Sequence, residues 1–160
     1  MNSNHFDEHG NAVMVYVSAK QPTLRTAVAE AVVRLSPELL AAIGEGGVAK
    51  GDVLGVSRLA GIVAAKKTPE LIPLSHPLAL HSVAIGFALD GTTGRIIVQC
   101  TVRAFERTGV EMEAMTGAAV AALTIYDMCK GSDKSIVIGE IKLLYKEGGK
   151  SGVYRREEGR

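Results

Sequence analysis

The sequence predicts an α+β sandwich in which an antiparallel sheet carries its helices on one face. Alternating apolar positions indicate strands in several parts of the chain, and capping residues indicate helices between them. The elements follow the order strand, helix, two strands, helix, strand, which is typical of a ferredoxin-like arrangement. With 160 residues, the chain is long enough to bury the core of one domain.

The strands are predicted from period-two patterns. Residues 26–35 alternate two sets of side chains, which favours a strand, although the alanines in one set favour helix. Residues 83–89 and 96–105 flank a turn at 90–94 and predict a hairpin. Short apolar runs predict further strands at residues 13–17, 135–138 and 141–145.

Capping residues mark the first two helices. The Ser-Pro pair at residues 36–37 predicts the start of a short helix that stops at Gly44. Asp52 predicts the N-cap of a second helix, which ends before the Thr-Pro pair that begins at Thr68.

The helix expected over residues 108–130 organises the chain. Thr108 and Glu111 fit a capping box at its start, and Gly131 fits a left-handed stop after its end. Its middle has small side chains and no polar face, so we expect it to be buried on all sides and to allow close backbone approach.

Asp127 stands out in the last turn of this helix, where a carboxylate opposes the helix dipole. Its neighbours Tyr126 and Met128 suggest that it is half-buried, which raises the pKa of a carboxyl group unless a cation lies beside it. Lys130 is three residues away and shares its helix face. The two form either an acid–base pair or a structural ion pair.

The distance along this helix favours a site shared between two chains. Glu111 and Asp127 lie roughly 24 Å apart at 1.5 Å per residue, so one helix cannot bring both ends together. Two copies packed antiparallel about a twofold axis place the Glu111–Glu113 end near the partner's Asp127–Lys130 end.

Two glycine-rich loops carry lysines. Residues 44–52 contain Lys50 just before a helix, and residues 146–152 contain Lys146 and Lys150. Each is either an ordinary flexible loop or an anion site, in which free amides and a lysine meet phosphate. Neither loop has the spacing of a Walker motif.

His76 lies in a segment stiffened by two prolines, residues 71–80, which cannot form a regular helix. Within it, Ser75 and His76 are the polar side chains in apolar surroundings. A lone histidine of this kind is either a satisfied structural group or an acid–base group held in position. His81 does not share a helix face with it, so we expect no metal pair.

Composition excludes several classes of protein. The 18 basic and 17 acidic residues do not suggest bulk nucleic-acid binding, and no apolar run reaches membrane-spanning length.

The chain is expected to divide into three parts. Residues 1–12, with His5 and His9, are expected to be flexible and to hold no metal. Residues 13–152 are expected to form a single catalytic domain, and residues 153–160 a charged flexible tail. Two cysteines make no disulfide framework, which indicates a cytoplasmic location.

Five separated blocks lie in order along the chain, at residues 50–53, 71–78, 108–114, 123–130 and 148–152. Together they resemble the molybdenum cofactor biosynthesis protein C family, the cyclic pyranopterin monophosphate synthases. The likeness runs from about Met14 to Gly152. One departure is Ser75, where the family's motif often has cysteine, so a thiol at that position cannot be essential.

The resemblance implies a lyase of molybdenum cofactor biosynthesis. Its substrate would be (8S)-3',8-cyclo-7,8-dihydroguanosine 5'-triphosphate, supplied by a radical S-adenosylmethionine enzyme, and its products cyclic pyranopterin monophosphate and pyrophosphate. The resemblance also implies a ferredoxin-like homo-oligomer, a hexamer built as a trimer of dimers with active sites between subunits. No flavin, nicotinamide or metal-cluster motif is present, so no cofactor is expected, and magnesium accompanying the phosphates is left open.

Carried over by position, Asp127 becomes the catalytic acid–base residue, and Lys50 and Lys130 become the lysines for proton transfer and phosphate contact. His76 suits the same proton transfers, because ring opening and closing need several of them. The expected substrate-binding residues are Leu74, Ser75, His76, Glu111, Met112, Glu113, Lys146 and Lys150.

Two other classes compete with an enzyme. A nucleotide-binding regulator would explain the glycine loops and lysines, but not an acid at the wrong end of a helix. A structural oligomer would explain the alanine-rich helix, but not the polar residues in apolar settings. Pyrophosphate release from the cyclised GTP substrate separates the enzyme from both.

Overall fold

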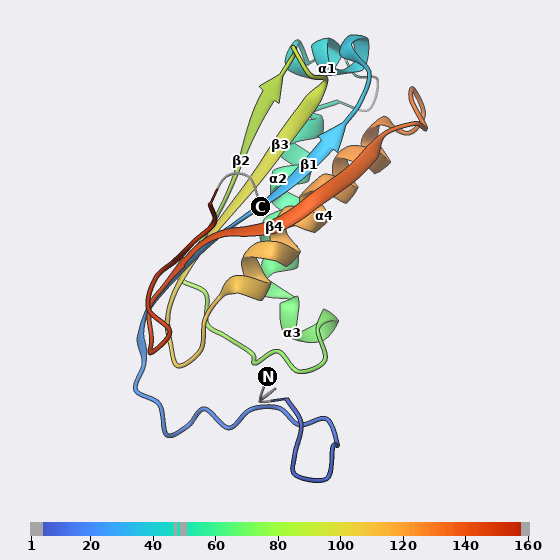
Figure 1. Ribbon diagram of the computed structural model, residues 1–160. Helices are drawn as coiled ribbons and strands as arrows, with labels where there is room; N and C mark the ends of the chain where they lie inside the picture. The colour runs from blue at the N-terminus through green and yellow to red at the C-terminus, as the bar shows by residue number, and fades with distance from the viewer. Residues whose placement is uncertain (1–4, 47, 49–50, 158–160) are drawn as a thin grey trace.

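The computed structural model describes residues 5–46, 48 and 51–157, which form one layer of helices on one face of a sheet (Figure 1). The strands are β1 (Thr23–Arg34), β2 (Ser82–Asp90), β3 (Arg95–Glu106), β4 (Val137–Glu147) and β5 (Tyr154–Arg155). The helices are α1 (Pro37–Gly44), α2 (Val53–Lys66), α3 (Thr68–Leu71) and α4 (Glu111–Cys129).

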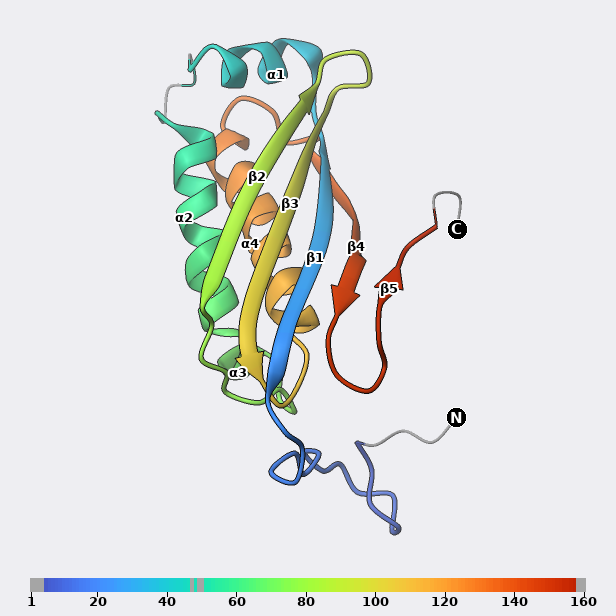
Figure 2. The same cartoon turned by 90° about the vertical axis from the view of Figure 1, so that its left-hand side faces the viewer.

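The sheet has the order β2-β3-β1-β4-β5, and each neighbouring pair is antiparallel. Figure 2 shows α2 and α4 lying side by side behind the same face, with α1 at one end of the sheet and α3 at the other. The prediction of a ferredoxin-like α+β sandwich is confirmed, because the two long helices each connect strands across this sheet.

The contact between the sheet and α4 is built from small side chains. On β1, Ala27, Ala29 and Ala31 have no exposed surface, and on α4 neither do Ala118 and Ala121. Alternation along β1 therefore places its alanines toward the helices, which confirms the strand over a segment whose alanines favour helix.

The two long helices approach each other at a pair of glycines. A Cβ atom added to Gly61 of α2 would lie 2.8 Å from the carbonyl oxygen of Gly117 in α4. One added to Gly117 would lie 2.7 Å from Cys100 Sγ on β3. Only glycine fits between these backbones, so the sequence fixes how closely α2 and α4 pack.

The two predicted N-caps are confirmed. The Ser36 hydroxyl accepts a hydrogen bond of 3.3 Å from the Leu39 N–H at the start of α1. The Asp52 carboxylate accepts one of 2.7 Å from the Gly55 N–H at the start of α2. Both caps satisfy an N–H group that the first turn of a helix leaves unpaired.

Two strand predictions were wrong. Residues 13–17 form no strand, because their backbone runs outside the sheet. The two short strands expected at 135–138 and 141–145 are one strand, β4, interrupted by irregular pairing with β1. Glu140 has a positive φ of 52° there, and such a bulge breaks the alternation that the sequence pattern relies on.

The expected ends of α4 were also wrong. Val110 is the N-cap and makes no side-chain cap, so the helix starts at Glu111 and the capping box from Thr108 does not form. Gly131 does not adopt the left-handed conformation. Instead, the N–H groups of Ser132 and Asp133 donate to the Cys129 carbonyl at 2.9 and 3.1 Å.

Helix α4 is buried on one side only in the single chain. Leu123 in its middle is 56% exposed and Met112 near its start is 39% exposed. The expectation of burial on all sides is therefore wrong for one chain by itself.

The ends of the chain carry local structure. Phe6 and Ala12 form an isolated antiparallel bridge, and Tyr154 and Arg155 in the expected tail pair with β4 as β5. The domain limits at residues 12 and 152 stay predictions. Among the described helices, none is both long and apolar enough to cross a membrane.

Candidate functional site

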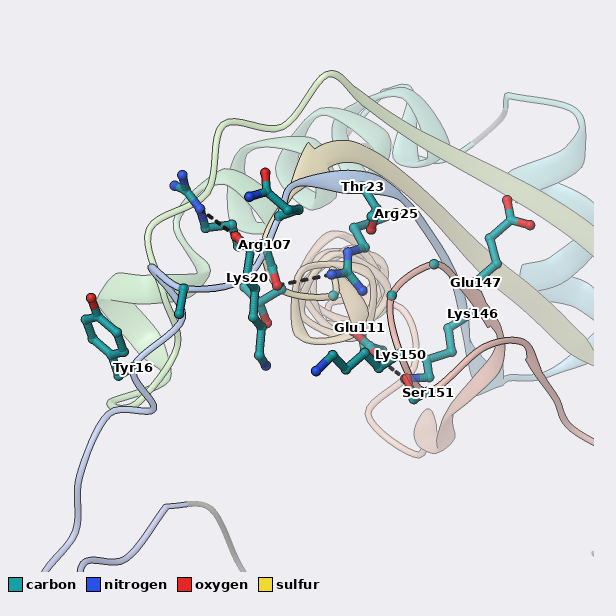
Figure 3. Close-up of a pocket in the computed structure, with 16 residues that line it drawn as sticks. Tyr16, Lys20, Thr23, Arg25, Arg107, Glu111, Lys146, Glu147, Lys150 and Ser151 are labelled. Atoms are coloured by element: carbon teal, nitrogen blue, oxygen red, sulfur yellow. Dashed lines mark hydrogen bonds and ion pairs between the residues drawn. The ribbon is translucent and has the colours of Figure 1, made fainter.

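Two adjoining cavities lie at the end of the sheet where α4 begins. The larger has a volume of about 930 Å³ (Figure 3), and the smaller about 340 Å³. Lys20, Thr108, Gly109 and Glu111 line both of them. The segment before β1 and the loop before α4 therefore form a wall that the two cavities share.

The larger cavity is basic. Five of its lining side chains are basic and two are acidic, which leaves an excess of positive charge for an anion. One of the acids is already paired, because Lys146 Nζ lies 3.0 Å from Glu111 Oε1. Lys146 also donates a hydrogen bond of 2.7 Å to the Ser151 hydroxyl. The basic residues are Lys20, Arg25, Arg107, Lys146 and Lys150.

Arg25 is the buried cation of this cavity, with only 8% of its surface exposed. Its Nε donates to the Glu106 carbonyl at 3.1 Å and its Nη2 to the Arg107 carbonyl at 3.0 Å. Within the part of the chain that the structure describes, it forms no ion pair with a carboxylate. A buried charge satisfied only by neutral carbonyls favours an anionic ligand beside it.

The glycine turn between β4 and β5 packs directly against Arg25. Gly148 and Gly149 have positive φ angles of 100° and 73°. A Cβ atom at Gly148 would collide with the Leu24 carbonyl, and one at Gly149 with the Arg25 guanidinium. Figure 3 shows Arg25 between the backbone of Arg107 and the loop that carries Lys150. The glycines therefore allow that loop to close over the cation.

The smaller cavity gathers residues from three distant segments, one of which is the stretch before β1 with Val15 and Val17. Leu74, Ser75 and His76 come from the proline-stiffened loop, and Met112 and Glu113 from the first turn of α4. Six of the eight expected substrate-binding residues therefore lie around this space, since Glu111 lines it too. Glu111 also joins it to the larger cavity, which Lys146 and Lys150 line.

Glu113 is the buried acid of the smaller cavity. It is 2% exposed, and its Oε1 has no hydrogen-bond partner among the described residues. Burial raises the pKa of the Glu113 carboxyl to about 7, with a smaller contribution from the negative charge of Glu111, against a backbone hydrogen bond that lowers it. A carboxyl group with a pKa near neutrality is suited to accept and donate a proton.

His76 is half-buried, and its Nε2 lies 2.7 Å from the Val15 carbonyl oxygen. The loop around it forms no regular helix, as the two prolines at 73 and 77 predicted. Its ring is therefore tied by one nitrogen to the segment before β1.

Asp127 and Lys130 lie at the other end of α4 and line neither cavity. Lys130 Nζ is 2.6 Å from Asp127 Oδ1, and this hydrogen bond raises the pKa of the lysine. The Asp127 side chain is 62% exposed, so the expectation that it is half-buried was wrong. The last turn of α4 itself packs on the core, because Ile125 and Cys129 are fully buried, but Asp127 lies on its exposed side.

Lys50 and its neighbours Gly47 and Ala49 lie outside the described residues, so the anion site expected there stays a prediction. The sequence missed Lys20, Arg25 and Arg107 as cavity residues. Arg25 alone carried a signal, because it continues the positions of β1 that hold the buried alanines. A cation in the buried alternation of a strand indicates where the apolar core ends along that strand.

The family model described as the MoaC family matches residues 14–149. A protein of Pelobacter propionicus named cyclic pyranopterin monophosphate synthase is 81% identical over 159 residues, covering 99% of each chain. A protein of the same name from Geotalea uraniireducens is 74% identical and covers both chains completely. A third, from Pelotomaculum thermopropionicum, is 53% identical over 96% of this chain and 90% of its own length.

Proposed function

Since the chain belongs to the MoaC family, we propose that it catalyses the reaction after which its relatives are named, the synthesis of cyclic pyranopterin monophosphate. The protein is a lyase of molybdenum cofactor biosynthesis. It converts (8S)-3',8-cyclo-7,8-dihydroguanosine 5'-triphosphate into the cyclic monophosphate and releases pyrophosphate.

The two cavities divide this substrate between them. The larger, basic cavity takes the triphosphate, and the observation that carries this assignment is the buried Arg25 guanidinium without a carboxylate partner among the described residues. Lys146 and Lys150 line the same space and supply further positive charge. Guanidinium and ammonium groups make short, charge-assisted hydrogen bonds to phosphate oxygens.

The smaller cavity takes the ring system. Rearranging a nitrogen-rich ring needs proton transfers in both directions, and each needs a group that holds a proton near neutral pH. Glu113, with its pKa raised to about 7 by burial, and His76 lie on the lining of this cavity. Ser75 and Met112 complete the contacts, and no thiol is needed at position 75.

The catalytic set is completed by a second copy of the chain. Glu111 and Asp127 are 16 positions apart on the continuous helix α4, roughly 24 Å at 1.5 Å per residue. Antiparallel pairing of two α4 helices would place the partner's Asp127–Lys130 pair near the cavities of this chain. The exposed Leu123 in the middle of α4 supports such pairing, because the partner's helix would cover it. Three such dimers would then assemble into a hexamer, as a trimer of dimers with its active sites between subunits.

The setting of the reaction is part of the proposal. A radical S-adenosylmethionine enzyme would supply the cyclised substrate in the cytoplasm. The cavity chemistry uses acid–base groups and cations and needs no resident cofactor, with magnesium entering only as a companion of the phosphates. Lys50 would act with Lys130 in proton transfer and phosphate contact.

The test is turnover of the purified protein with the cyclised GTP substrate, followed by assay of both pyrophosphate and cyclic pyranopterin monophosphate. We expect the two products to appear in equal amounts. Binding of the substrate without either product would mean a nucleotide-binding regulator and would overturn the assignment. Arg103→Ala, which removes an exposed arginine outside both cavities, is the matched control for variants of Arg25.

A further inference from the structure

The segment before β1 forms part of both cavities. Val15, Val17 and Lys20 line the smaller cavity, and Tyr16 and Lys20 line the larger one. Neighbouring residues of this segment therefore face the two spaces in turn. Figure 1 shows the segment passing below α3 and the end of the sheet, outside the layers of the fold. Its position is explained by contacts with the site and not by strand pairing.

Two hydrogen bonds tie this segment to the site. The Val15 carbonyl oxygen lies 2.7 Å from Nε2 of His76. Five residues later, the Lys20 carbonyl accepts a hydrogen bond of 3.0 Å from Nε of Arg107. One bond leads to the loop beside the smaller cavity, and the other to the loop before α4. Both acceptors are main-chain atoms, so the identities of the side chains at 15 and 20 do not determine these bonds.

The chemistry of the first bond fixes the state of the histidine ring. A carbonyl oxygen only accepts hydrogen bonds, so Nε2 of His76 must carry the hydrogen for this bond to exist. That holds for the neutral ring and for the protonated ring alike. As long as the bond persists, Nδ1 is the only ring nitrogen that can gain or lose a proton. Backbone carbonyls set the tautomer of functional histidines in this way.

We propose that residues 13–20 are a positioning element of the active site. The Val15 carbonyl holds His76 as the Nε2–H tautomer and orients its ring. His76 then exchanges its proton with the bound ligand at Nδ1, taking it there as a base and returning it from the same atom. The tautomer and the ordering of the segment stand on the hydrogen bond alone, whereas the proton exchange rests on the proposed function.

Two replacements of His76 separate the roles of its nitrogens. Glutamine can place an amide N–H near the position of Nε2, and asparagine can place one only near the position of Nδ1. We therefore expect hydrogen exchange of the backbone amides of residues 13–20 to keep its wild-type rate in His76→Gln and to become about tenfold faster in His76→Asn. Equal exchange in both variants would mean that the Val15 bond does not order the segment.

The tautomer is measured on the free protein labelled with ¹⁵N at histidine. We expect one ring N–H of His76, assigned to Nε2, to be protected from exchange with water. Protection should be lost in a chain that starts at Ser18, which lacks Val15 but keeps the Lys20 carbonyl. A hydrogen on Nδ1, or an unprotected ring in the full chain, would overturn the proposal whether or not the protein turns over its substrate.

Steady-state kinetics test the link to the reaction. The chain that starts at Ser18 should lose about tenfold or more in kcat, since a misplaced catalytic group costs rate even when the substrate still binds. A chain that starts at Asn11 keeps Val15 and should lose much less. Circular dichroism checks that both retain the sheet, which begins only at Thr23. Full kcat in the shorter chain would show that the segment has no part in catalysis.

Discussion

Glu111 Oε1 lies 3.0 Å from Lys146 Nζ, which joins the first residue of α4 to the end of β4 across the boundary of the two cavities. Each side chain of this pair is about one-quarter exposed, at 27% for Glu111 and 24% for Lys146. An anion entering the larger cavity would compete with Glu111 for the lysine. The pair therefore holds Lys146 at the wall of the larger cavity, within reach of the triphosphate proposed to bind there.

Arg25 is expected to contribute most of the affinity for the triphosphate. Arg25→Ala should raise KM about tenfold or more with a smaller change in kcat, since a hydrogen bond to a charged group contributes about 1.5–3 kcal/mol. Arg25→Lys should restore only part of the lost affinity, because lysine lacks the planar guanidinium that donates two parallel hydrogen bonds to phosphate. A wild-type KM in both Arg25→Ala and the control Arg103→Ala would contradict the assignment of Arg25 to the triphosphate.

Glu113 is expected to make stability depend on pH. Its pKa is raised from 4.5 to about 7 in the folded chain, so the folded state holds the proton more tightly than the unfolded state. The contribution to stability is complete below about pH 4.5 and is lost as the pH rises through about 7, by an amount on the order of 3 kcal/mol.

Glu113→Gln keeps the size of the side chain and removes this titration. The difference in unfolding free energy between the variant and the wild type should therefore grow in favour of the variant from about pH 5 to about pH 8, measured by urea denaturation. A difference that stays constant over this range would mean that the Glu113 carboxyl is not perturbed in the folded chain.

The glycine turn offers a matched pair of substitutions. Gly149→Ala would place a methyl group against the Arg25 guanidinium, whereas Gly152 also has a positive φ, of 64°, but open space around its Cβ position. Gly152→Ala should cost only the backbone strain, about 1–2 kcal/mol. Gly149→Ala should cost more and also weaken the stabilisation of the protein by pyrophosphate in a thermal melt. Equal losses of stability and of pyrophosphate stabilisation in the two variants would show that a methyl group at position 149 does not press on Arg25.

Mixing two inactive variants tests the shared site. A dimer with Glu113→Gln in one chain and Asp127→Asn in the other has one site with both native residues and one site with neither. After random subunit exchange, activity should recover to about a quarter of wild type, since half the dimers are mixed and each has one working site of two. Mass spectrometry verifies the exchange, and no recovery despite it would place both residues in one chain's site.

Local signals in the sequence were sufficient for much of the fold. The alternation of residues 26–35 predicted β1, and the caps at Ser36 and Asp52 marked two helix starts, because each depends on residues within one turn or one strand. The capping box at Thr108 failed although its spacing was right. Glu111 instead pairs with Lys146, which lies 35 positions away in sequence and which no local pattern reveals.

The candidate site was harder to predict for the same reason. Leu74 to His76 and Met112 to Glu113 were predicted through a family resemblance, and the structure places them around one cavity. The exposure of Asp127 contradicts the half-burial expected from its apolar neighbours, whereas the burial of Glu113 was not predicted. Burial depends on which segments fold over a residue. Glu113 is covered where it lines the smaller cavity, whereas the Asp127 side chain is 62% exposed although Ile125 and Cys129 beside it are fully buried.

The alanine contact between β1 and α4 lowers the entropy that the core loses on folding. An alanine side chain has no rotamers to lose, so ordering this layer costs backbone entropy and almost no side-chain entropy. The same layer has no side chain that can rotate to admit a larger neighbour. We therefore expect changes of volume to be tolerated better at larger core residues, such as Ile96 and Ile125, than at the fully buried Ala29 or Ala118, where an added methyl group would overpack the core at a cost of about 1–3 kcal/mol.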